Sequence, residues 1–576
     1  MKCATIFSKL STVDFLFPYL NFVNSSLCNP IESTLSSTTD VDLEYAIYRG
    51  TYNEEMNQTE FLGIRYAASP TDDLRFQAPK TPNSMRDEGI LEANNFPPMC
   101  FQVFPGARPT TTPVDDSYMG GQSHMSSTIK TEISNETTNP SQSEDCLFLN
   151  VYVSGTLNPK EKMPVVIWIH GGGYLFGGGS TYPGGDLIKG AGGGIIAVVI
   201  QYRLGLFGFL AGNEVKKKGS LNAGLLDQRF ALEWIQDNIH LFGGDPNKVT
   251  IWGETAGAGS VIQHMVAHGG HSSKKLFSNA ITSSIFLPSQ YNYDDPIPEK
   301  IYSDTIRLTG CGSTNNSFVC LTQVDALLLG AANLAINNAG FFGTVAFVPV
   351  VGGELIAEQP MKTIAKGFLN SERYLAVSNT FEGRLMVYPN LSSQMDTYTF
   401  VKHLFPSFSI SQIQKTVRQY TNIGLNTVEE QAAAIIGESI FICPGYTILS
   451  VFHGKGYKGL YAVPPGNHGA DIQHYFPGID NSGVPPEINP FYNNTIFSTS
   501  FSGGFLGFVK FDDPNKHTLP ESKLPEWEVY NEHKSKTEML FNRTSDMHPD
   551  IRSIKTDSKL LKRCEFWKRV APFVPH

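Results

Sequence analysis

The stretch KVTIWGETAGAGS (Lys248–Ser260) decides the fold of this 576-residue chain. An apolar run ends at Gly253, a turn follows, and small residues then continue at helical spacing. This order matches the nucleophile elbow G-x-S-x-G, in which a serine is held on a sharp bend between a strand and a helix. Here the residue at the tip of the bend is Thr255. The stretch therefore predicts an α/β fold and raises the question of which chemistry survives.

Strand-like and helix-like runs alternate along the chain from about Val41 onward. Length and β-branched residues predict buried strands at 164–170, 194–203, 249–253, 279–285, 373–379 and 459–463. Helices are predicted at 223–239 and 256–268. Alternation of this kind implies a mostly parallel sheet with helices on both faces.

A glycine run follows the first of these strands in WIHGGGYLFGGGS (168–180). Acyl transfer builds negative charge on a carbonyl oxygen, and backbone N–H groups stabilise that charge when no side chain blocks their approach. A glycine run alone is also typical of a flexible turn. Because this run follows a strand and precedes an elbow, it predicts an oxyanion hole.

An acid and a histidine follow the elbow in the order that such a hydrolase needs. Glu382 stands directly after the strand LAVSN, and His468 stands in a loop rich in proline and glycine after the strand GLYAV. A histidine in a loop can reach the elbow, and a carboxylate can hold its second nitrogen. Taken alone, each residue is more often structural. Their order relative to Thr255 favours catalytic roles.

Several further motifs resemble the type-B carboxylesterase and cholinesterase-like family of α/β hydrolases, from about residue 41 to 570. The segment EDCLFLNVYV (144–153) resembles one family signature, and FLGIRYAASPTDDLRFQAP (61–79) resembles the N-terminal one. The run FLAGNEVKKKGSLNAGLLDQR (209–229) is similar to the fungal lipase and esterase branch. The departure from the family pattern is the threonine at the nucleophile position.

The resemblance implies an α/β-hydrolase fold in one domain, residues 41–570, and a set of site residues. It implies Thr255 as nucleophile, Glu382 as acid and His468 as base, with oxyanion donors at Gly172, Gly173 and Ala256. It also implies disulfides between Cys100 and Cys146, between Cys311 and Cys320, and between Cys443 and Cys564. Cys3 and Cys28 lie outside the match and have no assigned partner. The expected substrate is a small-molecule or lipid carboxylic ester, with no cofactor and no metal.

Threonine at the elbow leaves three interpretations. The hydroxyl remains a nucleophile that His468 could deprotonate, but the extra methyl group adds strain at a bend that needs positive φ. We therefore expect reduced activity. The alternative is an inactive scaffold, although a decaying site has no reason to keep Glu382, His468 and the glycine run. A third interpretation is an altered sequence, through a sequencing error or a deliberate inactivating change.

Two further residues stand near the elbow. Ser260 lies on the following helix and cannot reach the tip of the turn. Glu254 either tunes the local electric field or is a structural carboxylate.

Composition and sequons place the chain outside the cell. Net charge is −10 without blocks of like charge, which argues against nucleic acid, and no apolar stretch approaches the length of a membrane span. Residues 1–40 suit an N-terminal extension or a secretory leader, and 101–145 suit a polar, lid-like loop. Together with the cysteines, the sequons predict secretion. They lie at Asn24, Asn57, Asn135, Asn315, Asn390, Asn493 and Asn542.

Overall fold

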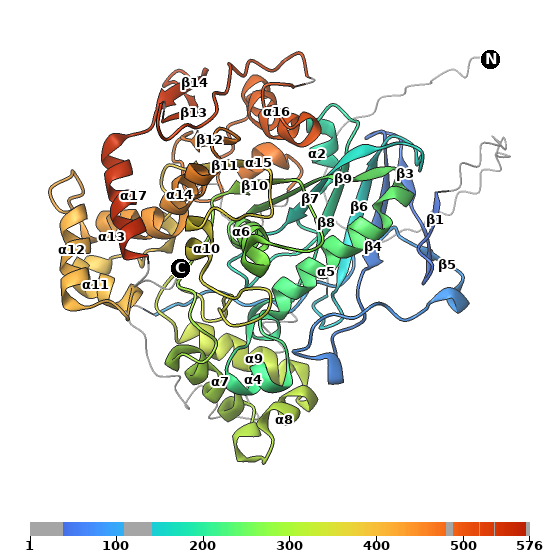
Figure 1. The fold of residues 1–576 in the computed structure, drawn as a ribbon, viewed down its shortest axis with the longest axis horizontal. Coiled ribbons are helices and arrows are strands. Elements are labelled where there is room, and N and C mark those ends of the chain that lie inside the picture. Colours follow the sequence, from blue (N-terminus) through green and yellow to red (C-terminus); the bar gives the residue numbers. More distant parts are fainter. Residues whose placement is uncertain (1–38, 109–140, 480–487, 518, 535, 572–576) are drawn as a thin grey trace, which may run out of the picture. The chain divides into compact units, whose positions relative to one another are not determined.

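A twisted sheet of eleven strands runs through the protein (Figure 1). Its strand order is β14-β13-β12-β11-β10-β9-β7-β8-β6-β4-β3. The strands from β8 to β13 pair in parallel, and antiparallel pairs close both edges. The central strands are continuous runs of buried residues, as expected of strands covered on both faces. The predicted α/β-hydrolase fold class is confirmed.

The computed structural model describes residues 39–108, 141–479, 488–517, 519–534 and 536–571. Thr39 onward forms one compact unit. Several predictions lie outside the described residues: the first 38 residues of the N-terminal extension or leader, most of the 101–145 loop, and the residues Cys3, Cys28, Asn24 and Asn135.

The strands are β1 (Asp40–Asp42), β2 (Ile47–Arg49), β3 (Thr51–Asn53), β4 (Gln58–Arg65), β5 (Ile90–Glu92), β6 (Phe148–Ser154), β7 (Met163–Ile169), β8 (Ile196–Ile200), β9 (Gly244–Glu254), β10 (Asn279–Ser283), β11 (Arg373–Asn379), β12 (Gly456–Tyr461), β13 (Thr537–Arg543) and β14 (Pro549–Lys555). The helices are α2 (Gly185–Gly190), α3 (Gly205–Phe209), α4 (Asn213–Lys218), α5 (Ala223–Asn238), α6 (Ala256–Gly270), α7 (Pro296–Leu308), α8 (Ser317–Gln323), α9 (Ala326–Asn338), α10 (Pro360–Ala365), α11 (Thr397–Leu404), α12 (Ile410–Tyr420), α13 (Val428–Ile436), the π-helix η8 (Gly437–Ile442), α14 (Cys443–Val451), α15 (Ile472–Tyr475), α16 (Thr495–Phe511) and α17 (Ser558–Val570).

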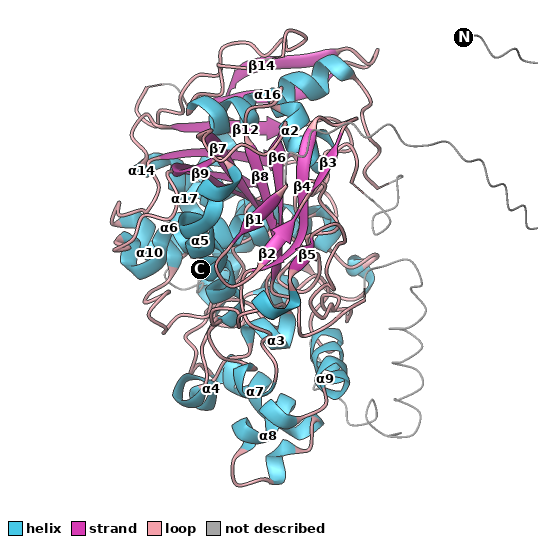
Figure 2. Cartoon of the chain, turned by 90° about the vertical axis from the view of Figure 1, so that its right-hand side faces the viewer, coloured by secondary structure: helices cyan, strands magenta, loops and turns pink. Residues whose placement is uncertain are grey.

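Helices cover both faces of the sheet (Figure 2). Side chains of β7 alternate between the faces, so Ile167 and Ile169 join the core under α5 and α6. Trp168 points the other way, into an aromatic core with Trp252 under α2 and α16. The two cores hold the sheet between packed layers of helices. The ends of its parallel strands can therefore position site residues precisely.

The predicted elements agree with the structure to within a few residues. The strands expected at 164–170 and 373–379 are β7 and β11, and the helix expected at 223–239 is α5. The helix after the elbow is α6, whose backbone departs from helical geometry at Ala267–Gly269. The strands of both sheet edges were not predicted, because polar residues interrupt their apolar runs.

One continuous helical stretch among the described residues, Val428–Val451, is long and apolar enough to cross a membrane. The most apolar 18-residue window of this stretch is 83% buried inside the protein, which is typical of a core helix. The expectation of no membrane span stays a prediction.

Candidate active site

Thr255 stands between β9 and α6 with φ 53° and ψ −116°, a backbone conformation that a β-branched residue rarely adopts. Hydrogen bonds hold it there. Its N–H donates to the Ser283 carbonyl (3.0 Å), and its own carbonyl accepts from the N–H groups of Gly259 (2.8 Å) and Phe286 (3.2 Å). A Cβ at Gly257 would overlap the Ile169 carbonyl, so the turn closes this tightly only on glycine. The bend predicted from the sequence is present.

The three predicted triad residues lie together. Thr255 Oγ1 is 2.6 Å from His468 Nε2, and His468 Nδ1 is 2.6 Å from Glu382 Oε2. Glu382 follows β11 and His468 follows β12, so two neighbouring parallel strands deliver them to the same end of the sheet as the elbow. Glu382 is fully buried and His468 nearly so. The arrangement can carry a proton from the hydroxyl to the imidazole and stabilise the resulting cation.

Glu254 adds a second carboxylate to the site. Its Oε1 contacts Thr255 Oγ1 and lies 3.3 Å from His468 Nε2. Burial, partly offset by the nearby His468 and by the Thr255 hydroxyl, raises the pKa of Glu254 to about 7. Burial disfavours the imidazolium, but the hydrogen bond and charge of Glu382, with the charges of Glu254 and Asp471, raise the pKa of His468 to about 9.

A buried network behind Glu382 was not predicted from the sequence. Glu382 Oε1 accepts from Ser284 Oγ (2.8 Å) and from the backbone N–H of Asn379 (2.5 Å). Asn379 Nδ2 donates to Asp471 Oδ1 (2.9 Å), and Asp471 Oδ2 accepts from Tyr475 (3.0 Å). Ser284 and Asn379 stand at or just past the ends of β10 and β11, which is the only signal that could have identified them. The network fixes the carboxylate that holds His468.

The predicted oxyanion donors stand on two segments that meet at the elbow, where Gly171 packs against Thr255. Gly172 and Gly173 have φ of 87° and 64°, and Ala256 is the first residue of α6. Within the described residues, the three N–H groups donate to no protein acceptor. His170 shapes the loop: its ring stacks on Tyr202, and burial lowers the pKa of His170 to about 4, so the ring is neutral. Free amides beside a helix N-terminus suit a developing anion.

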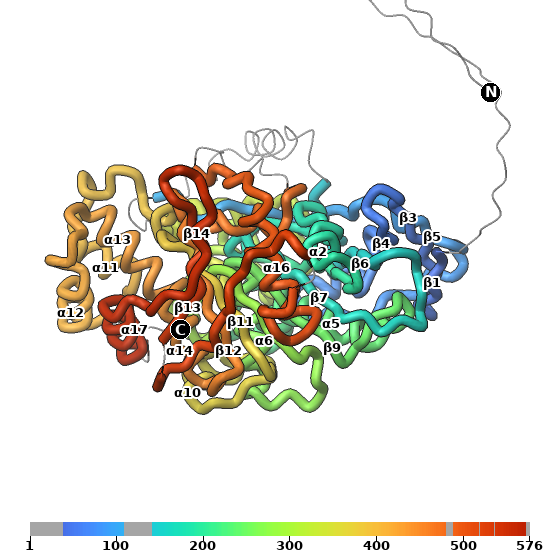
Figure 3. The backbone as a smooth tube through the Cα atoms, turned by 90° about the horizontal axis from the view of Figure 1, so that it is seen from above, coloured from blue at the N-terminus to red at the C-terminus, as the bar shows by residue number. Residues whose placement is uncertain are grey.

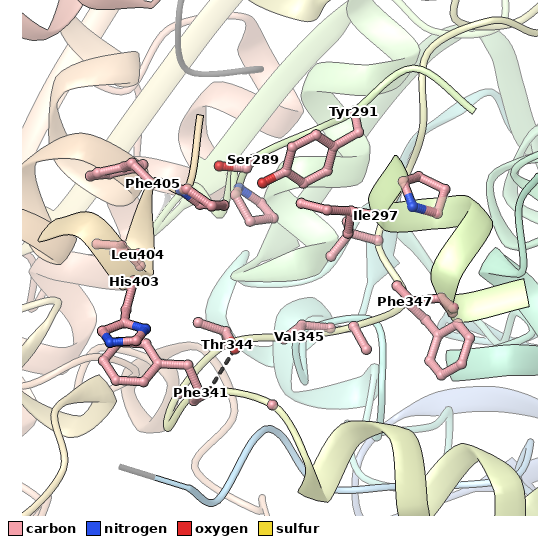
Figure 4. A pocket seen from close by; sticks show the side chains of 18 of the residues that line it. Ser289, Tyr291, Ile297, Phe341, Thr344, Val345, Phe347, His403, Leu404 and Phe405 are labelled. Atoms are coloured by element: carbon pink, nitrogen blue, oxygen red, sulfur yellow. Dashed lines mark hydrogen bonds between the residues drawn. The ribbon is translucent and has the colours of Figure 1, made fainter. Parts of the chain in front are cut away.

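An apolar cavity of about 700 Å³ opens beside the site. Figure 4 shows its wall, with Tyr291 and Ile297 on one side, Val345 and Phe341 opposite, and Leu404 with Phe405 closing one end. The triad residues do not line it. Three lining residues connect it to them.

The first of these, Phe286, donates its N–H to the Thr255 carbonyl. The Phe441 ring lies 4.9 Å from the His468 ring. Val345 Cγ2 is 3.5 Å from where a Cβ of Gly173 would stand. The cavity therefore shares part of its wall with the residues that contact the triad and the oxyanion loop.

The structure forms the three disulfides that the resemblance implied: Cys100–Cys146, Cys311–Cys320 and Cys443–Cys564. Of the described sequon asparagines, Asn57, Asn315, Asn390 and Asn493 are exposed, and Asn542 is half-buried on β13. Among the described residues, no three His, Cys, Asp or Glu side chains are grouped as a metal site requires.

Comparisons with known proteins agree with this geometry. A model of the carboxylesterase family matches residues 37–567. Lipase 2 of Geotrichum candidum is 30% identical over 502 residues, which are 82% of this chain and 86% of that lipase. The secreted triacylglycerol lipase LIP1 of Gibberella zeae is 29% identical over 542 residues, 85% of each chain. The crystal structure of Aspergillus niger EstA has a TM-score of 0.78 at 27% identity and covers 94% of this chain and 99% of that one. The resemblance seen in the sequence is confirmed: the chain belongs to the carboxylesterase family and is a hydrolase of the carboxylesterase and lipase type.

Proposed function

We propose that this protein hydrolyses carboxylic esters through an acyl-threonine intermediate. Thr255 is the nucleophile, His468 the general base, and Glu382 the acid that orients the imidazole. The observation that carries the proposal is the continuous hydrogen-bonded chain across these side chains, 2.6 Å at each step. Both distances lie within the reach that proton transfer needs.

In the first half-reaction, Thr255 Oγ1 attacks the ester carbonyl carbon while its proton passes to His468 Nε2. The carbonyl oxygen becomes an oxyanion, which the N–H groups of Gly172, Gly173 and Ala256 stabilise. Each such donor contributes about 3–4 kcal/mol to transition-state stabilisation. When the C–O bond breaks, the leaving alkoxide takes the proton from Nε2 and departs as the alcohol.

In the second half-reaction, water attacks the acyl carbon and gives its proton to His468 Nε2. A second oxyanion forms in the same hole. Collapse of this intermediate breaks the bond to Thr255 Oγ1, which takes the proton back and releases the carboxylic acid. Glu382 keeps its negative charge throughout and stabilises the imidazolium in both halves.

We expect slow turnover, for two reasons. The positive φ of Thr255 strains a β-branched residue by roughly 1–3 kcal/mol, and its methyl group adds bulk next to the reacting hydroxyl. In addition, an ionised Glu254 competes with His468 for the hydroxyl proton, since both accept from Thr255 Oγ1. This carboxylate carries its charge above its pKa of about 7, so it still accepts from the hydroxyl at the higher pH where His468 becomes neutral and can act as a base.

The cavity supports esters with an apolar acyl chain as substrates. Its lining is dominated by aliphatic and aromatic side chains, and Phe286 and Phe441 connect it to the elbow and the imidazole. Burying each methylene of an acyl chain contributes about 0.8 kcal/mol. We therefore expect kcat/KM to rise from acetyl to medium-chain esters.

The test compares the native chain with Thr255→Ser, Thr255→Ala and His468→Ala on p-nitrophenyl acetate, butyrate and octanoate. We expect measurable turnover by the native chain, a gain of roughly tenfold to a hundredfold in Thr255→Ser, and background rates in the other two variants. An organophosphate should add its mass to the Thr255 peptide. Native turnover that survives His468→Ala would contradict the mechanism. A native rate at background, with gain in Thr255→Ser, would instead identify an inactive relative.

We further infer that the chain is secreted and glycosylated. Three disulfides form, four described sequon asparagines are exposed, and two relatives are named secreted lipases. Expression in a secreting host should give medium-borne protein whose mass falls after treatment with an endoglycosidase. Protein retained in the cells at its unmodified mass would contradict the inference.

A further inference from the structure

One wall of the apolar cavity is the π-helix η8. Ile440 and Phe441 line the cavity, and Ile436 does so from the last turn of α13. Phe441 also packs between the His468 ring (4.9 Å) and the Phe286 ring (5.5 Å). The Ile440 carbonyl accepts from the Leu287 N–H (3.2 Å). A single π turn inside a longer helix is often found at functional sites, and this one aims two apolar side chains at the acyl cavity.

The opposite side of η8 is fixed to the C-terminal helix α17. Glu438 forms a two-pronged ion pair with Arg563, with N···O distances of 2.6 and 2.7 Å. Glu438 Oε2 also accepts from the Tyr420 hydroxyl (2.9 Å), whose oxygen accepts from Trp567 Nε1 (2.6 Å). The side chains of Glu438 and Arg563 are only 8% and 15% exposed. Both charges are thus held in one geometry away from solvent.

A covalent bond repeats this attachment a few residues further on. Cys443 directly follows η8 and is bonded to Cys564, the residue next to Arg563. Glu438 and Cys443 therefore bracket Ile440 and Phe441, and both connect to one short stretch of α17. Figure 3 shows α17, from the far end of the sequence, beside α14 and the group of α11 to α13.

Stability alone explains this arrangement poorly. A buried ion pair is often no more stabilising than apolar side chains of similar volume, because both charges lose their hydration. What a buried pair with additional hydrogen bonds does supply is one fixed geometry. Here that geometry sets the position of the wall that an acyl chain would contact.

We propose that Arg563 and Cys564 of α17 are specificity-determining residues, which set acyl-chain selection by fixing the η8 wall of the cavity. The proposal rests on the proposed ester hydrolysis for its substrate class. We call the Glu438–Arg563 ion pair and the Cys443–Cys564 disulfide the clamp. Neither bond involves Thr255, His468 or Glu382, so we expect loss of the clamp to act mainly on chain length, through the position of Ile440 and Phe441. In an apolar pocket, one methylene is worth roughly 10–200-fold in selectivity, so a small shift of the wall has a measurable effect.

Two readouts test the proposal, on Arg563→Gln, Arg563→Lys and the double variant Cys443→Ser/Cys564→Ser. The first is the affinity for a fluorescent eleven-carbon fatty acid, which needs no turnover. The second is the kcat/KM ratio of p-nitrophenyl octanoate to acetate. We expect the fatty-acid affinity and the octanoate-to-acetate ratio to fall roughly threefold to tenfold in Arg563→Gln and in the double variant. In Arg563→Lys both values should lie between those of Arg563→Gln and the native chain. The pH profile should not change in any variant.

Matched controls come from the same chain. Arg75→Gln breaks an ion pair with Glu144 (2.6 Å) that is at least as buried, and Cys311→Ser/Cys320→Ser removes a disulfide whose cysteines line no part of the cavity. Both controls should keep the native affinity and ratio. If the double variant does not fold, the two single Arg563 variants decide.

An affinity and a ratio within twofold of native in folded Arg563→Gln, or the same loss in the controls, would overturn the proposal. Failure of the proposed ester hydrolysis looks different. It removes turnover of both esters in every variant, while the fatty-acid affinities still separate the clamp variants from the controls.

Discussion

Glu254 and Thr255 together set how the site can work. A serine at position 255 would present the same hydroxyl without the branching methyl, and the Thr255 Cβ already lies only 3.1 Å from where a Cβ of Gly171 would stand. The neighbouring carboxylate then adds a second acceptor beside the same hydroxyl. Catalysis here depends on whether the Thr255 hydroxyl donates to Glu254 or to His468, and this depends on pH because both acceptors titrate.

The pH–rate profile should therefore reach unusually high pH. His468 acts as a base only when neutral, and its pKa is raised to about 9, so kcat/KM should rise as pH rises towards 9. Glu254→Gln removes a charge that helps raise this pKa, so the rising limb should move down towards the ordinary histidine value of 6.5. The measurement is kcat/KM on one ester from pH 5 to 10. If the rising part of the pH profile stays at the same pH in Glu254→Gln, this carboxylate does not act on the pKa of His468.

Asp471 should act as a positioning residue at one remove from the triad. It holds Asn379, whose backbone N–H donates to Glu382. We expect Asp471→Asn to lower kcat by roughly tenfold with little change in KM, because the imidazole loses orientation while the substrate cavity is unchanged. The control is Asp513→Asn, which changes a half-exposed carboxylate that makes no hydrogen bond to the described network. A change in KM alone would contradict the positioning role.

At the scale of elements, the strands and helices that carry the triad could be predicted from the sequence. Their apolar runs have clear length and period, and the elbow has steric demands that only glycine at 257 meets. The buried network could not be predicted, since Ser284, Asn379 and Asp471 meet only when the ends of β10 and β11 and the start of α15 are brought together. The cavity wall could not be predicted either. It combines irregular segments with a π-helix whose side chains, Glu438 and Phe441, face different neighbours.

The elbow should tolerate no side chain at Gly257. Gly257→Ala places a Cβ against the Ile169 carbonyl, which is backbone and cannot move aside. We expect destabilisation of about 1–3 kcal/mol or more, with loss of soluble protein. The matched control is Gly353→Ala, where the nearest atom to the new Cβ is 3.9 Å away. Thermal unfolding and soluble yield of the two variants provide the measurement. Equal behaviour would mean that the turn can open without loss of the fold.

For the whole molecule, the three disulfides should differ in what they contribute to stability. They close loops of different length, with sequence separations of 121, 46 and 9 residues for Cys443–Cys564, Cys100–Cys146 and Cys311–Cys320. Restricting the unfolded chain by loops of these lengths contributes about 4.9, 4.0 and 2.6 kcal/mol in the chain-entropy treatment. The longest loop also joins α17 to the cavity wall, so stability and selectivity depend on the same bond.

The order of the three contributions can be measured. A folded unit of this size gains about 1.1 kcal/mol per kelvin of unfolding entropy, so removing Cys443–Cys564 should lower the unfolding midpoint by about 4 °C and removing Cys311–Cys320 by about 2 °C. Each pair is replaced by serines and heated at one fixed scan rate, because large disulfide-bonded chains often unfold irreversibly. If Cys311–Cys320 proved the most stabilising bond, strain or residual structure in the unfolded chain would outweigh loop length. The selectivity change expected for Cys443→Ser/Cys564→Ser would then need the Arg563 variants alone to support it.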